Sequence, residues 1–280
     1  MTGKPPITMS SWTLGSHCTF EQRCEAASAA GYQGIGLRAE NYVDALNEGL
    51  TDDDLLVLLQ RYHLRCTEVE YIVQWCEEPR TYLQKYKEQI CFHMCQLFQV
   101  NRINTGLLET YPIDYVAQKL RELCQRTGQL IIALEPMPYS GIPDLATAWQ
   151  IIQQADCPNI GLLLDVWHWA RAKHPVDSLT TAQAKRVVAI QLDDANQRAY
   201  APTVLRAESM HDRLAPGDGA AVSSKFIRML KLAGVQPQVI GVEVVSDRAL
   251  AKGINWTAND TYRKTKQVLA DTWPEMLSVV

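Results

Sequence analysis

Short, nearly continuous apolar segments alternate along this chain with longer segments in which apolar residues recur every three or four positions. The segments QLIIALE (Gln129–Glu135) and IGLLLD (Ile160–Asp165) are of the first kind. The segment TDDDLLVLLQRYHL is of the second kind, with Thr51 as a helix cap and aspartates in the first turn. Such alternation predicts buried β-strands that take turns with amphipathic α-helices.

The same pattern runs through the whole chain. We expect strands at Ile7–Trp12, Gln33–Arg38, Arg65–Tyr71, Asn101–Gly106, Gln129–Glu135, Ile160–Asp165, Val187–Asp194 and Val239–Val245. We expect helices from Thr19 to Gly31, from Thr51, and over Pro79–Phe98, Ile113–Arg126, Pro143–Gln154, Val176–Lys185, 220–234 and Ala258–Asp271. Repeated strand–helix units imply a parallel sheet, and this many in 280 residues indicate one α/β domain over residues 1–280, a single (β/α)8 TIM barrel.

A doubly wound open sheet is the alternative architecture. The chain has no G-x-G-x-x-G after its first strand and no Walker A motif, so dinucleotide and P-loop sites lack sequence support. The connection Ala195–Gly219 is about twice the usual length, and long loops in compact domains are often functional.

Charge and cysteine usage restrict the partners and the compartment. The formal net charge of −4 gives no basic surface for nucleic acid, and we expect none as a partner. The eight cysteines include no C-x-x-C pair, which favours reduced thiols in a cytoplasmic protein. The sequence shows neither a signal peptide nor a membrane span, so we expect no membrane partner, and it leaves a homo-oligomer open.

Four consecutive predicted strands carry oxygen-bearing side chains at or near their carboxyl ends. They are Glu135, Asp165, Gln191 and Glu243. In a TIM barrel these ends lie on the catalytic face. Three carboxylates at one place repel each other unless a cation neutralises them, and an all-oxygen set suits Mg²⁺ or Mn²⁺. We therefore predict one divalent metal ion there, with Co²⁺ and Zn²⁺ as alternatives.

Two further residues complete the candidate site. His168 lies three residues after Asp165 and could assist as a general acid or base, or donate to a substrate. Arg213 precedes Pro216 and Gly217 in a tight loop, where a guanidinium is suited to hold a substrate oxygen or carboxylate.

Taken together, these motifs resemble the sugar phosphate isomerase/epimerase superfamily, the xylose-isomerase-like barrel. The resemblance rests on the Glu-Pro at Glu135, the D-x-x-H from Asp165 to His168, the R-x-x-P-G-x-G over 213–219, and Glu243, and it covers essentially the whole chain. Members include ketose 3-epimerases, inosose dehydratases and 3-dehydroshikimate dehydratases. The motifs are typical of the superfamily but do not specify a substrate.

The resemblance implies a metal site and a set of roles. The implied ligands are Glu135, Asp165, Gln191 and Glu243. The implied catalytic residues are Glu135, Glu243 and His168. His168 and Arg213 would contact the substrate, a small sugar, cyclitol or hydroxy acid. The implied chemistry is isomerisation or epimerisation by proton abstraction through a metal-stabilised enediolate.

One position departs from the epimerase pattern, which has histidine where this chain has Gln191. An amide oxygen can ligate a hard cation, but a glutamine here resembles the dehydroshikimate dehydratase branch. A dehydratase of the 3-dehydroshikimate or inosose type is therefore the alternative. Two other classes have less support. An endonuclease IV-like enzyme would need more histidines than the six present, and a sugar-binding barrel without activity would not need the acidic set.

Overall fold

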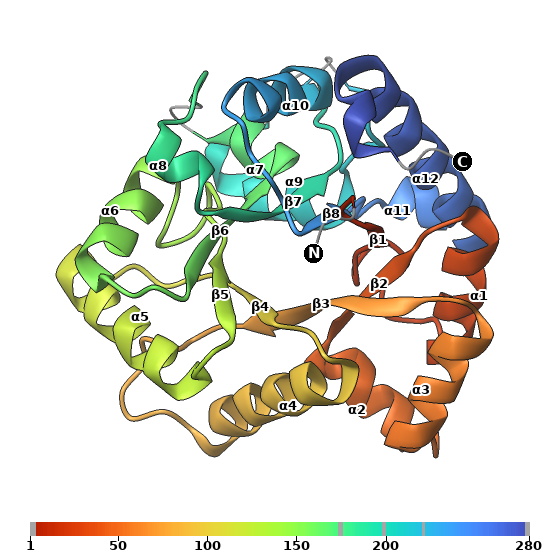
Figure 1. Ribbon diagram of the computed structural model, residues 1–280, viewed down its shortest axis with the longest axis horizontal. Helices are drawn as coiled ribbons and strands as arrows, with labels where there is room; N and C mark the ends of the chain where they lie inside the picture. The colour runs from red at the N-terminus through yellow and green to blue at the C-terminus, as the bar shows by residue number, and fades with distance from the viewer. Residues whose placement is uncertain (1–3, 173–175, 198–199, 220–221, 278–280) are drawn as a thin grey trace.

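Eight parallel strands close into one barrel, and helices surround it (Figure 1). The structure is a computed structural model that describes residues 4–172, 176–197, 200–219 and 222–277. The strands are β1 (Ile7–Met9), β2 (Gly34–Arg38), β3 (Arg65–Ile72), β4 (Arg102–Thr105), β5 (Ile131–Leu134), β6 (Ile160–Asp165), β7 (Val187–Leu192) and β8 (Val239–Val242). Each strand pairs with the next, and β8 pairs with β1. The predicted single (β/α)8 barrel is confirmed, and the open sheet is excluded.

The helices form a ring outside the strands, as Figure 1 shows. They are α1 (Phe20–Ala30), α2 (Ala39–Asn47), α3 (Asp52–Arg61), α4 (Tyr82–Phe98), α5 (Ile113–Thr127), α6 (Leu145–Ala155), α7 (Val166–Arg171), α8 (Thr181–Ala184), α9 (Leu205–His211), α10 (Val222–Leu232), α11 (Asp247–Leu250) and α12 (Ile254–Thr272), with 3-10 turns η1 (Pro202–Val204) and η2 (Pro274–Met276). Thr19 and Thr51 cap α1 and α3 through complete capping boxes, as their sequences indicate.

The helices differ from expectation at several places, among them the unpredicted α7, α9 and α11 and the start of α12 at Ile254 instead of Ala258. Helix α2 starts directly after β2 and was not predicted, because its short sequence has only a few apolar positions to bury. The helix expected over Val176–Lys185 is reduced to α8, since α7 already occupies the space after β6. In the helix expected over 220–234, the first two residues lie outside the described part.

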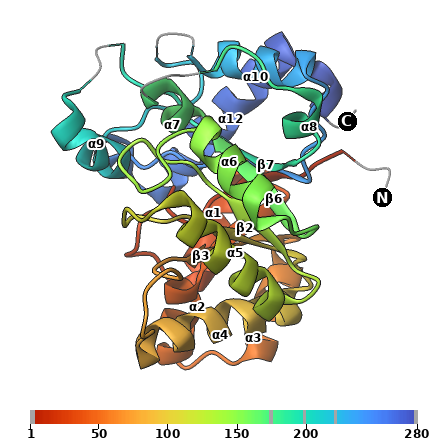
Figure 2. The same ribbon diagram turned by 90° about the vertical axis from the view of Figure 1, so that its left-hand side faces the viewer.

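The long connection after β7 carries structure of its own. Figure 2 shows α9, which lies within it, standing out on the side of the molecule opposite the labelled N-terminus. Two isolated antiparallel bridges, Asp194 to Leu214 and Asp212 to Ser246, tie the end of this segment back to the region where β7 and β8 end. The bridges place Arg213 between them. Residues 198–199 of the segment lie outside the described part.

Beneath the predicted site residues of β5 to β8, the barrel interior is apolar. Ala133, Leu163, Ala189 and Val239 pack together as one buried cluster. Each lies two or four residues before a predicted site residue, so the two-residue period of a strand turns both sets toward the barrel axis. A second and much larger apolar core fills the space between the strands and the helices. Leu163 therefore supports the layer directly beneath Asp165.

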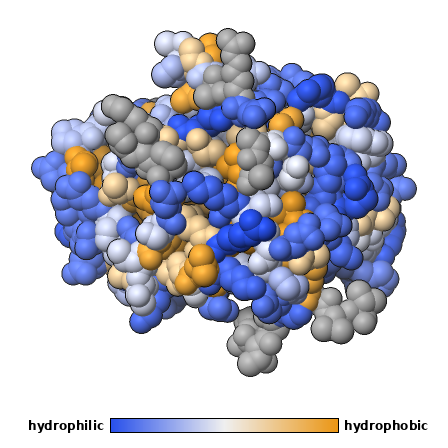
Figure 3. Space-filling view, turned by 90° about the horizontal axis from the view of Figure 1, so that it is seen from above, coloured by the Kyte–Doolittle hydropathy of each residue, from blue (hydrophilic) through white to orange (hydrophobic). Residues whose placement is uncertain are grey.

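Hydrophilic residues dominate the face of the molecule that Figure 3 shows, with scattered hydrophobic residues among them. Among the described residues, no helix combines the length and apolar character needed to cross a membrane. All eight cysteines are free thiols, as predicted.

Leu163 offers a test of the interior packing. We expect Leu163→Ala to lower the free energy of unfolding by about 2–5 kcal/mol, because it leaves a cavity in a closed barrel that cannot collapse around it. Denaturant unfolding of wild type and variant measures the difference. Leu232→Ala is the matched control, since Leu232 is 88% exposed, and should change the value by less than about 0.5 kcal/mol. Equal losses for both variants would contradict this account.

Candidate functional site

The four predicted ligands all lie at the carboxyl ends of neighbouring strands. Glu135 follows β5, Asp165 ends β6, Gln191 is next to last in β7, and Glu243 follows β8. Asp165 is registered with Gln191, and Gln191 with Gly241, which precedes Glu243 by two residues. All four side chains are buried. The strands thus bring these residues to one end of the barrel interior.

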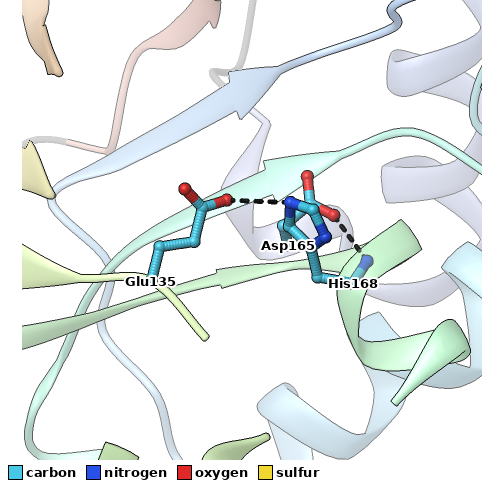
Figure 4. A group of neighbouring side chains, drawn as sticks. All are labelled: Glu135, Asp165 and His168. Carbon is cyan, nitrogen blue, oxygen red and sulfur yellow. Dashed lines mark hydrogen bonds and ion pairs between the residues drawn. The ribbon is translucent and has the colours of Figure 1, made fainter. Parts of the chain in front are cut away.

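Glu135, Asp165 and His168 form a cluster of possible metal ligands in the site (Figure 4). Each offers one ligand atom, and these atoms lie within 4.8 Å of one another. His168 Nε2 is 3.4 Å from Glu135 Oε1. The backbone N–H of His168 donates to Asp165 Oδ1 at 2.8 Å, because Asp165 also caps α7. The sequence indicated His168 as an assisting group, and the structure places its ring nitrogen among the ligand atoms.

Arg213 supplies the positive charge of the site. Its Nη1 lies 2.9 Å from Asp165 Oδ2, 2.8 Å from Asp193 Oδ2 and 3.1 Å from Glu243 Oε2. Its Nη2 donates to Ser209 Oγ at 2.8 Å. The guanidinium is 3% exposed, so these contacts are little screened by water. One buried cation therefore serves three carboxylates and draws two of the predicted metal ligands together.

The carboxylates are crowded enough to change their protonation. Burial, then repulsion by Glu243 and Asp165, raises the pKa of Glu135 well above its usual range. Burial raises the pKa of Glu243 to about 8, against the attraction of Arg213. Burial also raises the pKa of Asp165. These shifts arise first because burial disfavours the charged form of each group, and the attraction of Arg213 offsets that effect only in part for Asp165 and Glu243.

His168 shows the opposite shift for the same reason. Burial and then the neighbouring Arg213 lower the pKa of its imidazole well below the usual value. The ring is therefore neutral near pH 7, with one nitrogen free to accept a proton or bind a metal. Its Nδ1 is buried and has no hydrogen-bond partner among the described residues.

The donor set fits a divalent cation. Gln191 Oε1 is buried and has no hydrogen-bond partner in the described part of the chain, although the same amide donates through Nε2 to Glu68 and Glu70. An unpaired buried carbonyl oxygen is costly unless something else binds it. The carboxylate oxygens of Glu135 and Asp165, together with the unpaired amide oxygen that Gln191 could add, suit Mg²⁺ or Mn²⁺, and the imidazole nitrogen of His168 admits Co²⁺ or Zn²⁺.

Several residues of the site were not given a role from sequence. The Tyr71 hydroxyl donates to Glu135 Oε2 at 2.7 Å. Asp193 shares Arg213 with Asp165. Glu68 and Glu70, completely or almost completely buried on β3, contact Gln191. The alternating carboxylates of the segment RCTEVEY were a signal for that pair, because one face of a buried strand seldom carries two glutamates.

Comparisons with known proteins agree with the fold. The family model described as xylose isomerase-like TIM barrel matches residues 24–271. No curated protein sequence matches the chain. All three of the solved structures described next are below 25% identity, so their likeness shows the fold.

One similar structure is a fusion of a xylose isomerase-like TIM barrel with a 4-hydroxyphenylpyruvate dioxygenase, with a TM-score of 0.81 and 18% identity; 99% of this chain aligns with 45% of that one. This chain thus spans less than half the length of the fusion protein. A second is the IolI protein with a bound zinc atom, with a TM-score of 0.75 and 18% identity over 98% of this chain and 100% of that one. A third is the probable 3-DHS dehydratase AsbF from Bacillus anthracis, with a TM-score of 0.72 and 15% identity over 93% and 98%.

The contacts of Arg213 predict a large effect on stability. We expect Arg213→Met to destabilise the metal-free protein at pH 7 by about 3–5 kcal/mol, because it leaves buried carboxylates without a counter-charge. The loss should shrink as the pH falls, since protonation removes those charges. Denaturant unfolding at several pH values in the presence of a chelator measures both effects.

A matched control separates charge burial from the loss of an arginine. Arg263 pairs with Asp260 at the surface, where the arginine side chain is 70% exposed. Arg263→Met should cost less than about 1 kcal/mol at any of these pH values. A loss for Arg213→Met that is equally small would contradict the compensating role of Arg213.

Proposed function

Because the chain belongs to the xylose isomerase-like TIM barrel family, we propose that it is a divalent-metal-dependent enzyme that removes a proton next to the carbonyl group of a small polyhydroxylated compound. The observation that carries the proposal is the meeting of Glu135, Asp165 and a neutral His168 within 4.8 Å. Solved structures with a similar fold include the probable 3-DHS dehydratase described above and a D-allulose 3-epimerase from Methylomonas sp.. The substrate would be a sugar, a cyclitol or a hydroxy acid.

Glu135, Asp165, Gln191 and Glu243 would hold the metal, with His168 as an additional nitrogen donor close by. When bound, the ion stabilises negative charge on the substrate oxygen and so favours the enediolate. Mn²⁺ and Mg²⁺ fit the oxygen-rich set best, while His168 makes Co²⁺ and Zn²⁺ suitable as well.

The carboxyl groups of Glu135 and Glu243, whose pKa values are raised, would carry out the proton transfers. A carboxyl group whose pKa is raised toward neutrality can both accept and return a proton at physiological pH. In an isomerase or epimerase, Glu135 and Glu243 would act from opposite sides of one substrate carbon, one removing the proton and the other returning it. Arg213 and His168 would hold the substrate oxygens.

A dehydratase is the second candidate, and the asymmetry of the site favours it. Glu243 is bound by Arg213, whereas Glu135 contacts Tyr71 and His168. The two glutamates therefore have unlike surroundings, which would let one act as the base while a separate group serves as the acid. Loss of water needs one base for the α-proton and a separate acid for the departing hydroxyl. Gln191 in place of histidine, and the fold shared with the probable 3-DHS dehydratase, give this candidate further support.

The metal site can be tested directly. We expect purified wild-type protein to bind about one Mn²⁺ per chain, and Glu135→Gln or Asp165→Asn to reduce the bound metal by at least about tenfold, because each variant removes a charged ligand. Metal analysis after dialysis measures this. Glu88→Gln is a control, since Glu88 on α4 is a buried carboxylate paired with Arg80, which precedes α4, and with Arg126 on α5. Unchanged metal content in both site variants would refute the assignment.

The reaction can be tested with two assays on the Mn²⁺-loaded protein. Dehydration of 3-dehydroshikimate would give an aromatic product that absorbs ultraviolet light, and we expect this absorbance to rise. Epimerisation would instead introduce deuterium at the substrate carbon in D₂O, which proton NMR of a ketose panel detects. His168→Asn should slow whichever reaction occurs by about 10²–10⁴-fold. No aromatic product from 3-dehydroshikimate would exclude that dehydratase.

A further inference from the structure

We infer that Glu68 and Glu70 are positioning residues that fix the amide of Gln191 so that its oxygen faces the metal site. The inference rests on the proposed role of Gln191 as a ligand. It concerns a buried acidic pair that lies on β3, across the barrel interior from β7, and that the proposed reaction does not use.

The contacts of Gln191 are one-sided. Its Nε2 donates to Glu70 Oε1 at 3.1 Å and to Glu68 Oε1 at 3.3 Å, while its Oε1 has no hydrogen-bond partner in the described part of the chain. An ionised carboxylate only accepts hydrogen bonds. Turning the amide over would set its oxygen against two carboxylate oxygens. The glutamates therefore select one of two otherwise similar orientations, the one that presents an oxygen ligand.

The two glutamates are held firmly enough to serve as references. Asn104 Nδ2 donates to Glu68 Oε1 at 2.8 Å and to Glu70 Oε1 at 2.9 Å. The hydroxyls of Ser10 and Ser11 donate to the other oxygens, at 2.9 Å for Glu68 and 2.6 Å for Glu70. Each carboxylate thus receives three donors of the same kinds, the amides of Asn104 and Gln191 on one oxygen and a serine hydroxyl on the other.

The surroundings complete this network. Arg102, which is 2% exposed, donates through Nε to Asn104 Oδ1 at 3.3 Å and so orients the second amide. Gly241 leaves room for the Gln191 side chain, because a Cβ at Gly241 would lie only 3.0 Å from Gln191 Cγ. Both features keep Gln191 directed across the barrel.

This arrangement explains how Gln191 could serve as a ligand at a position where the epimerase pattern has histidine. A histidine ligand is normally oriented by a hydrogen bond from its second ring nitrogen to a carboxylate. The Gln191 amide makes the equivalent contact through Nε2, so the amide oxygen takes the place of the ligating nitrogen. Burial and then repulsion by Glu70 raise the pKa of Glu68 to about 7, so the pair retains negative charge at neutral pH. That charge could attract a cation without orienting anything, and the experiment must separate the two effects.

Two substitutions at Glu70 make that separation. Glu70→Gln removes the charge but keeps an oxygen that can accept from Gln191 and Asn104. Glu70→Met keeps a similar length and removes both. Calorimetric titration with Mn²⁺ should give an affinity for Glu70→Met that is about 10–100-fold weaker than wild type, the usual effect of losing an orienting partner, with Glu70→Gln at least about tenfold tighter than Glu70→Met.

The outcomes are distinct. Equal weakening in both variants would mean that charge alone matters and would overturn the inference, as would no change in either. If thermal unfolding shows that Glu70→Met is not folded, Glu68→Gln and Glu68→Met provide the same comparison, because Glu68 accepts hydrogen bonds from the same two amides. Thr67→Val is the control, because Thr67 lies on β3 like Glu68 and Glu70. The substitution removes the 2.7 Å hydrogen bond between Thr67 and Thr8 and should leave Mn²⁺ affinity unchanged.

The Glu135→Gln and Asp165→Asn variants show which proposal has failed. If neither changes the Mn²⁺ affinity, the metal site and the inference both fall. If both lose affinity while the two Glu70 variants behave alike, the metal site stands and the positioning role is wrong.

Discussion

Compensation of buried negative charge is the constraint on which this site depends. Asp165, Asp193 and Glu243 meet at one nitrogen of Arg213, and Glu135 lies beside them with only neutral partners, Tyr71 and His168. Several carboxylates with one guanidinium leave an excess of negative charge in a place that water hardly reaches. The protein can relieve the excess by holding protons, which the raised pKa values of Glu135 and Glu243 reflect, or by binding a cation.

The closed barrel keeps that arrangement in place. Because β8 pairs with β1, every strand is hydrogen-bonded on both sides, and the side chains at the strand ends have fixed origins. The interior beneath them is divided by strand. Small apolar residues such as Ala133 and Ala189 fill one part, and Glu68, Glu70 and Asn104 form a polar layer in another. Polar groups that are fully hydrogen-bonded specify one geometry, which a cluster of ligands requires.

The surroundings of the two catalytic candidates bear on the type of reaction. A neutral imidazole next to Glu135, and a guanidinium bound to Glu243, give the two sides of the site different chemical characters. Such a difference would let one side of the site act as a base while the other binds or protonates a substrate oxygen. The family match identifies the chain as a xylose isomerase-like TIM barrel, and the type of reaction is a proposal that rests on these local contacts.

The hydrophobic periodicity and the number of strand–helix units predicted the barrel. Strands buried on both faces appear as continuous apolar runs, whereas helices buried on one face have an apolar residue every three or four positions. The periodicity also located the strand ends, and with them Glu135, Asp165, Gln191 and Glu243. The partners of these groups were decided only by the tertiary structure. Asp193 contacts Arg213, and Glu70 contacts Gln191, and in both pairs the two residues lie far apart in the sequence. A local sequence pattern contains no information about which side chains meet across a barrel axis. For the same reason, the orientation of the Gln191 amide depends on glutamates more than a hundred residues earlier in the chain.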